Sequence, residues 1–174
     1  MLRRQVCLPL MVWFFFICTV PLATAESERH FLKMIDLSSN ATILSLPLFL
    51  DETFTIRYIH SVDHSPVFEV FELDQEGRLT LQATYFKMFG AGMGHWQGRG
   101  YIDFDGQWTW IRNIHETLGS FILRVGSPSV DHTLLYRGQE IPLSRKWAGK
   151  RLHVTVVRGS SGADTRKNNH AGGQ

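Results

Sequence analysis

Cysteine is absent from residue 26 onward, because both cysteines of this 174-residue chain, Cys7 and Cys18, lie in its first segment. Small exported domains often depend on disulfides when their hydrophobic core is too small to hold them together. A domain without cysteine must be stabilised by burial alone. The same absence excludes a thiol nucleophile and cysteine metal ligands from this part of the chain.

Familiar catalytic motifs are also missing. His115-Glu116 is followed by Gly119 where the zinc-protease motif H-E-x-x-H requires its second histidine. The chain has no G-x-S-x-G and no G-K-[ST] motif. His60 and Ser61 are neighbours, and neighbours on a strand point to opposite faces, so they do not predict a charge relay. The sequence therefore indicates no particular reaction and no cofactor, and it favours a protein that is not an enzyme.

The first segment has the features of an export signal. It begins Met-Leu-Arg-Arg, continues with the apolar run 6–22, and ends in Ala23-Thr24-Ala25 before Glu26. A basic start, an apolar core and an A-x-A site are typical of a secretory signal peptide. The alternative is an uncleaved N-terminal anchor, in which case residues 1–25 provide the only membrane contact. Either way, the rest of the chain is expected to be periplasmic or otherwise extracytoplasmic.

Charge is balanced overall but uneven along the chain. Removal of residues 1–25 leaves 149 residues with 16 basic and 16 acidic side chains, which predicts no binding to nucleic acid. Residues 26–105 contain 12 acids and 6 bases, whereas residues 106–174 contain 4 acids and 10 bases. This asymmetry indicates either a docking dipole or two halves whose strands interleave in one sheet.

Short alternating or β-branched runs separated by turn residues dominate residues 26–157, and no segment has convincing helical periodicity. The pattern predicts an all-β fold: a single antiparallel β-sandwich or barrel-like domain of roughly nine to eleven short strands. Asp74–Gly77 and Asp105-Gly106 supply turns. The polar residues 158–174 predict a disordered tail. We expect strands at 31–36, 41–46, 53–60, 67–74, 78–86, 100–104, 108–115, 120–125, 132–136, 139–143 and 151–157.

The segment 54–73 predicts a hairpin with polar residues on its core face. If His60 lies opposite Val67, then Tyr58 lies opposite Glu69, and His60 and Glu69 form a diagonal pair on the apolar face. A buried polar group must be hydrogen-bonded. The pair is therefore either a structural contact that closes one end of the sheet or part of a functional site, with His132 as a third member.

A glycine-rich segment at residues 89–100 is the second unusual feature. It does not match the dinucleotide-binding pattern, so it predicts either a long connection across the mouth of the sheet or a lid over a pocket.

Several motifs together resemble the domain of unknown function 1850 family over residues 53–157. They are F-x-I-x-Y-x-H-S-V-D from Phe54, V-x-E-V-x-E-L from Val67, F-x-x-F-G-A-G-M from Phe86, L-R-V-G, D-H-T-L and R-L-H-V-T-V. The resemblance implies a small exported protein, often encoded beside tripartite ATP-independent periplasmic transporters of the TAXI type. It also implies a ligand-binding role for a set of matching positions: His60, Ser61, Glu69, Phe89, Gly90, Gly92, Met93 and His132.

These observations predict an extracytoplasmic accessory domain that binds a partner protein or small ligand during solute uptake. The expected partners are a transporter's membrane subunits or its solute-binding protein. Two alternatives stay open: a metal-dependent or hydrolytic enzyme that uses His60, Glu69 and His132, and a structural envelope protein.

Overall fold

The structure is a computed structural model that describes residues 29–87 and 98–159. These residues form twelve strands and one short helix. In chain order they are β1 (Arg29–Asp36), β2 (Ala41–Leu48), β3 (Thr53–Ile59), β4 (Pro66–Leu73), β5 (Leu79–Phe86), β6 (Tyr101–Phe104), β7 (Thr109–Arg112), β8 (Glu116–Thr117), β9 (Ser120–Arg124), β10 (Thr133–Tyr136), β11 (Gln139–Pro142), α1 (Leu143–Trp147) and β12 (Arg151–Gly159).

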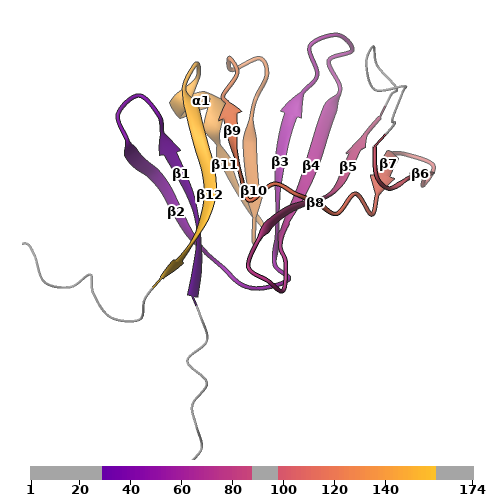
Figure 1. Cartoon of the computed structure of the whole chain (residues 1–174). Helices are drawn as coiled ribbons and strands as arrows, with labels where there is room; N and C mark the ends of the chain where they lie inside the picture. The colour runs from indigo at the N-terminus through magenta and orange to yellow at the C-terminus, as the bar shows by residue number, and fades with distance from the viewer. Residues whose placement is uncertain (1–28, 88–97, 160–174) are drawn as a thin grey trace, which may run out of the picture.

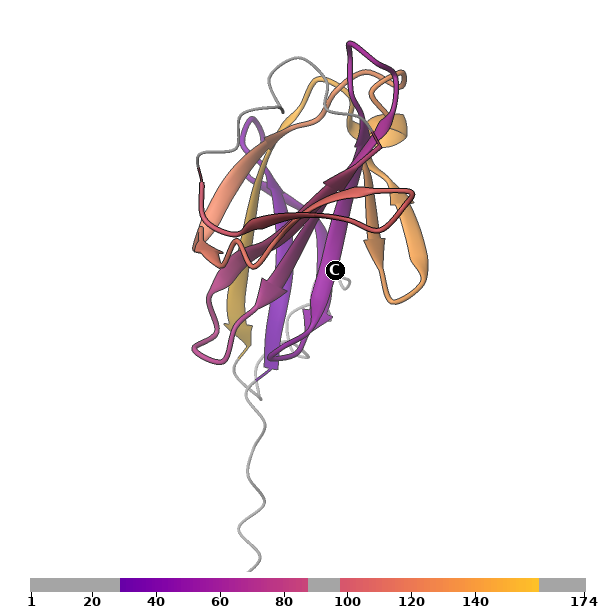
Figure 2. The same cartoon turned by 90° about the vertical axis from the view of Figure 1, so that its right-hand side faces the viewer.

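Two antiparallel sheets pack face to face, which confirms the all-β sandwich prediction (Figure 1). The smaller sheet has the order β2-β1-β12-β9. The larger has the order β11-β10-β3-β4-β5-β7-β6, with β8 also paired to β5. The first and last strands are neighbours, since β1 pairs with β12 from Arg29–Gly159 to Asp36–Leu152. Figure 2, viewed from the side of β6 and β7, shows the β6–β7 hairpin crossing in front of the other strands.

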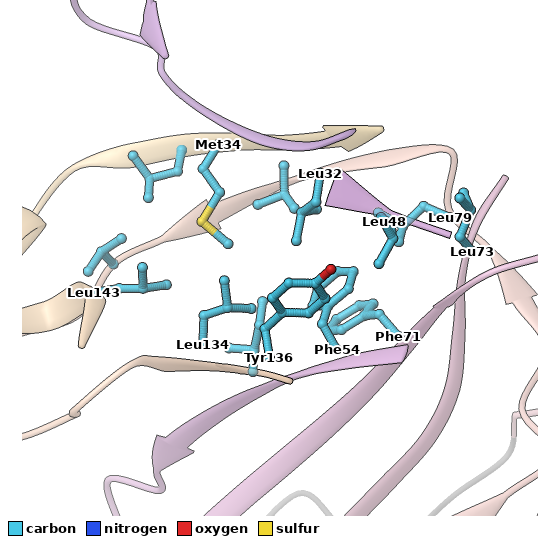
Figure 3. Close-up of a cluster of buried hydrophobic side chains, with 14 residues drawn as sticks. Leu32, Met34, Leu48, Phe54, Phe71, Leu73, Leu79, Leu134, Tyr136 and Leu143 are labelled. Carbon is cyan, nitrogen blue, oxygen red and sulfur yellow. The ribbon is translucent and has the colours of Figure 1, made fainter. Parts of the chain in front are cut away.

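The hydrophobic core lies between the sheets (Figure 3). Alternation along β1 directs Leu32 and Met34 inward, and both are fully buried. From the facing sheet, Phe54 of β3 stacks on Phe71 of β4 with ring centroids 5.2 Å apart. The burial expected of a domain without disulfides is therefore concentrated in these side chains between the two sheets, which we call the apolar layer.

Local backbone geometry accounts for two differences from the sequence prediction. The predicted strand 108–115 ends at Arg112, because Asn113 and His115 both have positive φ angles, 55° and 45°. The chain then forms the additional two-residue strand β8. The predicted strand 139–143 ends at Pro142, and Leu143 begins the helix α1 that the sequence pattern did not indicate.

The two ends of the sandwich differ in what they carry. The chain ends of the described domain lie together at the lower end in Figure 1, as the pairing of Arg29 with Gly159 requires. The β3–β4 loop and α1 lie at the upper end, which we call the loop end; we call the opposite end the base. Among the described residues, no helix is long and apolar enough to cross a bilayer.

Candidate functional site

The β3–β4 hairpin has a register two residues away from the predicted one. Tyr58 lies opposite Val67, Ile56 opposite Glu69 and Phe54 opposite Phe71. A shift of two residues keeps every side chain on its predicted face, because side chains alternate with a period of two. Glu69 therefore does share the inner face with the core residues Phe54 and Phe71, but its neighbours across the strand are different.

A short loop explains the changed register. The amide of His60 donates to the carbonyl of Ser65 at 2.9 Å, so pairing continues past β3 and only four residues, 61–64, form the loop. The Asp63 carboxylate closes it by accepting from the Ser65 amide at 3.2 Å and the Ser65 hydroxyl at 2.9 Å. His64 completes the turn with a φ of 54°. These hydrogen bonds to Ser65 hold the pKa of Asp63 below its usual range.

The predicted diagonal pair between His60 and Glu69 is therefore wrong. Glu69 lies opposite Ile56, four residues from His60 along the partner strand. At about 3.3 Å per residue, four residues span roughly 13 Å, which is too far for a direct contact. The imidazole of His60 instead lies 3.1 Å from Asp63, between His60 Nδ1 and Asp63 Oδ1.

Tyr58 takes the place that the prediction assigned to His60. It is the diagonal neighbour of Glu69 on the inner face, and its hydroxyl donates a hydrogen bond to the Glu69 carboxylate. Burial raises the pKa of Glu69, and the hydrogen bond from Tyr58 opposes that shift only in part. Burial, together with the charge of Glu69, raises the pKa of Tyr58 to about 12. The tyrosine therefore remains a neutral donor at physiological pH.

His132 approaches the same tyrosine from another part of the chain. The rings of Tyr58 and His132 stack with centroids 5.5 Å apart and an interplanar angle of 29°. The amide of Ile59 donates to the carbonyl of Val130 at 2.7 Å, which fixes the segment before His132 beside the end of β3. The structure thus brings together two of the predicted residues, Glu69 and His132, through Tyr58.

Hydrogen bonds hold the His132 ring in one orientation. Its Nδ1 accepts from the Gly126 amide at 3.0 Å, so the neutral ring carries its proton on Nε2. The His132 amide donates to Ser144 Oγ at 2.8 Å, and that hydroxyl donates to the Gly126 carbonyl at 3.0 Å. Burial lowers the pKa of His132. The ring is therefore uncharged at neutral pH.

The remaining predicted residues divide into two groups. Ser61 lies in the exposed loop at the tip of the hairpin, next to Val62, which is 63% exposed. The predicted positions in the glycine-rich segment lie outside the described residues; these are Phe89, Gly90, Gly92 and Met93.

The arrangement places one carboxylate, one phenol and one neutral imidazole on the inner face towards the loop end, where Tyr58 also packs against a second buried apolar cluster that includes Val67 and Phe86. Together they offer hydrogen-bond acceptors, a donor at His132 Nε2 and aromatic surface. In residues 29–87 and 98–159, no three histidine, aspartate or glutamate side chains are grouped so that they could hold a metal ion.

Sequence reasoning missed Tyr58 as a member of this site, although a signal was present. Strand alternation places Tyr58 on the same face as Ile56 and Glu69. The register of β3 on β4 could be predicted only from the length of the loop between them. That length depends on the hydrogen bonds of Asp63 and on the positive φ of His64.

Comparison with known proteins assigns the chain to a family. The model of the family described as domain of unknown function (DUF1850) matches residues 54–143, just over half of the chain, and the chain belongs to this family. No curated protein and no solved structure matches the chain.

Proposed function

We propose that this member of the family is an extracytoplasmic accessory domain that binds a partner protein or small ligand at its loop end during solute uptake. The proposed partners are the membrane subunits of a tripartite periplasmic transporter or its solute-binding protein. Export is proposed from the N-terminal segment, with its basic start, apolar run and Ala23-Thr24-Ala25 site. The link to a transporter depends on what family membership implies.

One observation carries the proposed site: the polar cluster of Tyr58, Glu69 and His132 occupies positions of the inner face where the pattern calls for core residues. Towards the base, the same faces of β3 and β4 present Phe54 and Phe71, which are 1% and 2% exposed. Nearer the loop end they present the phenol of Tyr58 and the carboxylate of Glu69, which are only partly buried, beside the fully buried Val67. A partly buried carboxylate lowers stability, and such a cost is typical of residues retained for function.

The exposed tip of the β3–β4 loop gives a partner protein a second contact. Val62 is 63% exposed in the β3–β4 loop, and this loop lies at the opposite end of the molecule from the chain ends (Figure 1). If residues 1–25 anchor the protein, the loop end points away from the membrane and towards soluble partners.

We favour binding over a hydrolytic or metal-dependent reaction. The enzyme hypothesis needs His60, Glu69 and His132 to act on one substrate, and the register puts His60 four residues away from the strand position opposite Glu69. His60 instead contacts Asp63 within its own loop.

The test is partner capture from native membranes. Affinity-tagged protein is expressed in its own host, crosslinked, solubilised and purified, and the bound proteins are identified by mass spectrometry. We expect transporter subunits or the solute-binding protein, and we expect Val62→Ser and Tyr58→Ala to reduce their recovery. Solute uptake should fall in parallel when each variant replaces the natural protein.

Ile122→Ser is the matched control variant. Ile122 is an exposed aliphatic residue, at 52%, but it lies on β9 at the edge of the smaller sheet. It should leave capture and uptake unchanged. Equal recovery of partners by all three variants, or normal uptake after deletion of the gene, would contradict the proposed function.

A further inference from the structure

When it is ionised, the Glu69 carboxylate has no counter-ion among the described residues. Its neighbours across the two adjacent strands are Ile56 and Thr84, neither of which is charged. Its one hydrogen-bond partner among the described residues is the neutral Tyr58 hydroxyl. Several acids elsewhere in the protein do pair with bases, as Glu52 does with Arg137 at 2.5 Å and Asp131 with Arg57 at 3.1 Å. Glu69 is thus a partly buried carboxyl group whose ionised form lacks a counter-ion within residues 29–87 and 98–159.

The neighbouring imidazole does not provide the missing charge. His132 Nδ1 is occupied as an acceptor by the Gly126 amide, and burial lowers the pKa of the ring, so His132 stays neutral beside Tyr58. The two stacked rings add electron-rich faces next to an anionic carboxylate. Aromatic faces attract cations, and the attraction grows when the site is partly removed from water.

We propose that the loop end binds a cationic group, an ammonium or guanidinium, which pairs with the Glu69 carboxylate and packs against the ring of Tyr58. This inference rests on the proposed function and names the chemistry of its ligand. The cation belongs either to a free small ligand or to a lysine or arginine side chain of the partner protein. Both sources present the same group to the same carboxylate.

The geometry favours a cation over the other ligand classes. An anionic ligand would be repelled by Glu69, because no described cationic side chain pairs with this carboxylate. An uncharged apolar ligand would leave the carboxylate desolvated and without a partner, which is costly. A cation removes that cost on binding, so part of its affinity comes from relief of an unfavourable free state.

The experiment uses three probes of similar size on the purified full chain: n-butylammonium, butyrate and 1-pentanol. Binding is followed by NMR at the side chains of Tyr58, Glu69 and His132. We expect saturable shifts with n-butylammonium and none with butyrate or the alcohol. Glu69→Gln should weaken n-butylammonium binding by more than about tenfold, because it removes the charge and keeps the shape.

Glu72→Gln provides the matched control. Glu72 is a second partly buried glutamate of β4, but at an odd spacing from Glu69, so it lies on the opposite face. This variant should bind n-butylammonium as the natural protein does. An equal response to the alcohol, preferential binding of butyrate, or unchanged n-butylammonium binding in Glu69→Gln would overturn the cationic assignment.

Partner capture distinguishes failure of this inference from failure of the proposed function. If no cation binds but capture still depends on Val62 and Tyr58, the proposed function stands and the ligand class is wrong. If n-butylammonium binds, its addition during capture identifies the source of the natural cation. Displacement of the captured partner indicates a lysine or arginine of that partner, whereas retention indicates a free small ligand.

Discussion

Phe54 and Tyr58 lie on the same face of β3, four residues apart, yet they belong to different environments. Phe54 is 1% exposed and stacks on Phe71 within the apolar layer (Figure 3). Tyr58 lies towards the loop end, hydrogen-bonded to Glu69 and stacked on His132. One continuous strand face thus serves as core near the base and as a candidate binding site near the loops.

This difference indicates which part of the fold supplies stability and which part lowers it. Near the base, most contacts are apolar and the Tyr136 hydroxyl donates to the Pro47 carbonyl, although the buried His30 ring has no hydrogen-bond partner among the described residues. At the loop end, a carboxylate remains desolvated without a cation among the described residues. Loss of apolar contacts should therefore cost most stability at the base, whereas removal of the Glu69 charge at the loop end should cost binding rather than stability.

The largest expected effect is the loss of Phe54. Phe54→Ala should lower the free energy of unfolding by about 3–5 kcal/mol, because it removes a fully buried ring and leaves a cavity between the sheets. Chemical denaturation measures the change. Phe104→Ala is the control, since Phe104 is 63% exposed on β6, and it should change stability by less than about 0.5 kcal/mol. Similar losses for both variants would show that the apolar layer is not the main source of stability.

His132→Ala should have the next largest effect. It leaves the Gly126 amide without its acceptor and removes the ring that packs on Tyr58, so we expect a loss of about 1–3 kcal/mol. His132→Asn, whose side-chain oxygen can still accept from Gly126, should recover part of that loss. Equal stability of the alanine variant and the natural protein would refute a role for this hydrogen bond in holding the loop.

The lowered pKa of His132 also predicts a pH dependence. Because the folded ring binds a proton less readily than the unfolded one, its contribution is complete above a pH of about 6.5 and is lost as the pH falls below that value. Urea denaturation across this range should show a loss that His132→Asn lacks.

Glu69→Gln should produce a smaller change of opposite sign. Burial raises the pKa of Glu69 in the folded state, so the carboxylate lowers stability increasingly as the pH rises above about 4.5, the ordinary value of this side chain. The glutamine variant avoids that cost and should equal or exceed the stability of the natural protein at pH 7. Parallel melting curves at pH 4 and pH 7 test this, with the exposed Glu116→Gln as a control. A clear loss of stability at pH 7 would mean that the pair with Tyr58 is a structural contact.

Val62→Ser should have the smallest effect on stability, within about 0.5 kcal/mol, because the side chain is already in water. Its effect on partner capture should be large if the loop tip contacts a partner. Measuring both stability and partner capture for Val62→Ser therefore separates an effect on binding from an effect on folding, which a substitution on the inner face would mix. Unchanged capture with unchanged stability would restrict the contact to the cluster of Tyr58, Glu69 and His132.

Much of the fold followed from local pattern. Alternation and turn residues predicted the all-β class and most of the strands, and Leu152 and Val154 are buried on one face of β12 as their spacing indicates. The faces of β3 and β4 were also predictable, since alternation assigns Glu69 to the inner face whatever the exact register. These properties depend only on near neighbours along the chain.

Pairing between strands was not predictable in the same way. In β5, Leu79 and Leu81 face inward, but a bulge between the pairs Val70–Ala83 and Phe71–Leu81 turns Tyr85 to the outer face, where it stacks on Phe68 and Trp110. Simple alternation from Leu79 would have kept Tyr85 with the core. In β3 and β4, a loop two residues shorter than expected replaced His60 with Tyr58 as the neighbour of Glu69.

In β3 and β4 the sequence by itself determined which residues face the core, because the side-chain period of an unbroken strand is set by its own backbone; in β5 the bulge was needed to turn Tyr85 outward. The tertiary structure alone decided which of them meet. Glu69, Tyr58 and His132 come together because a four-residue turn sets the register of β3 on β4 and because Gly126 and Ser144 hold His132 beside the end of β3. Such contacts depend on loop closure and on hydrogen bonds between distant segments, which the order of residues along a strand does not record.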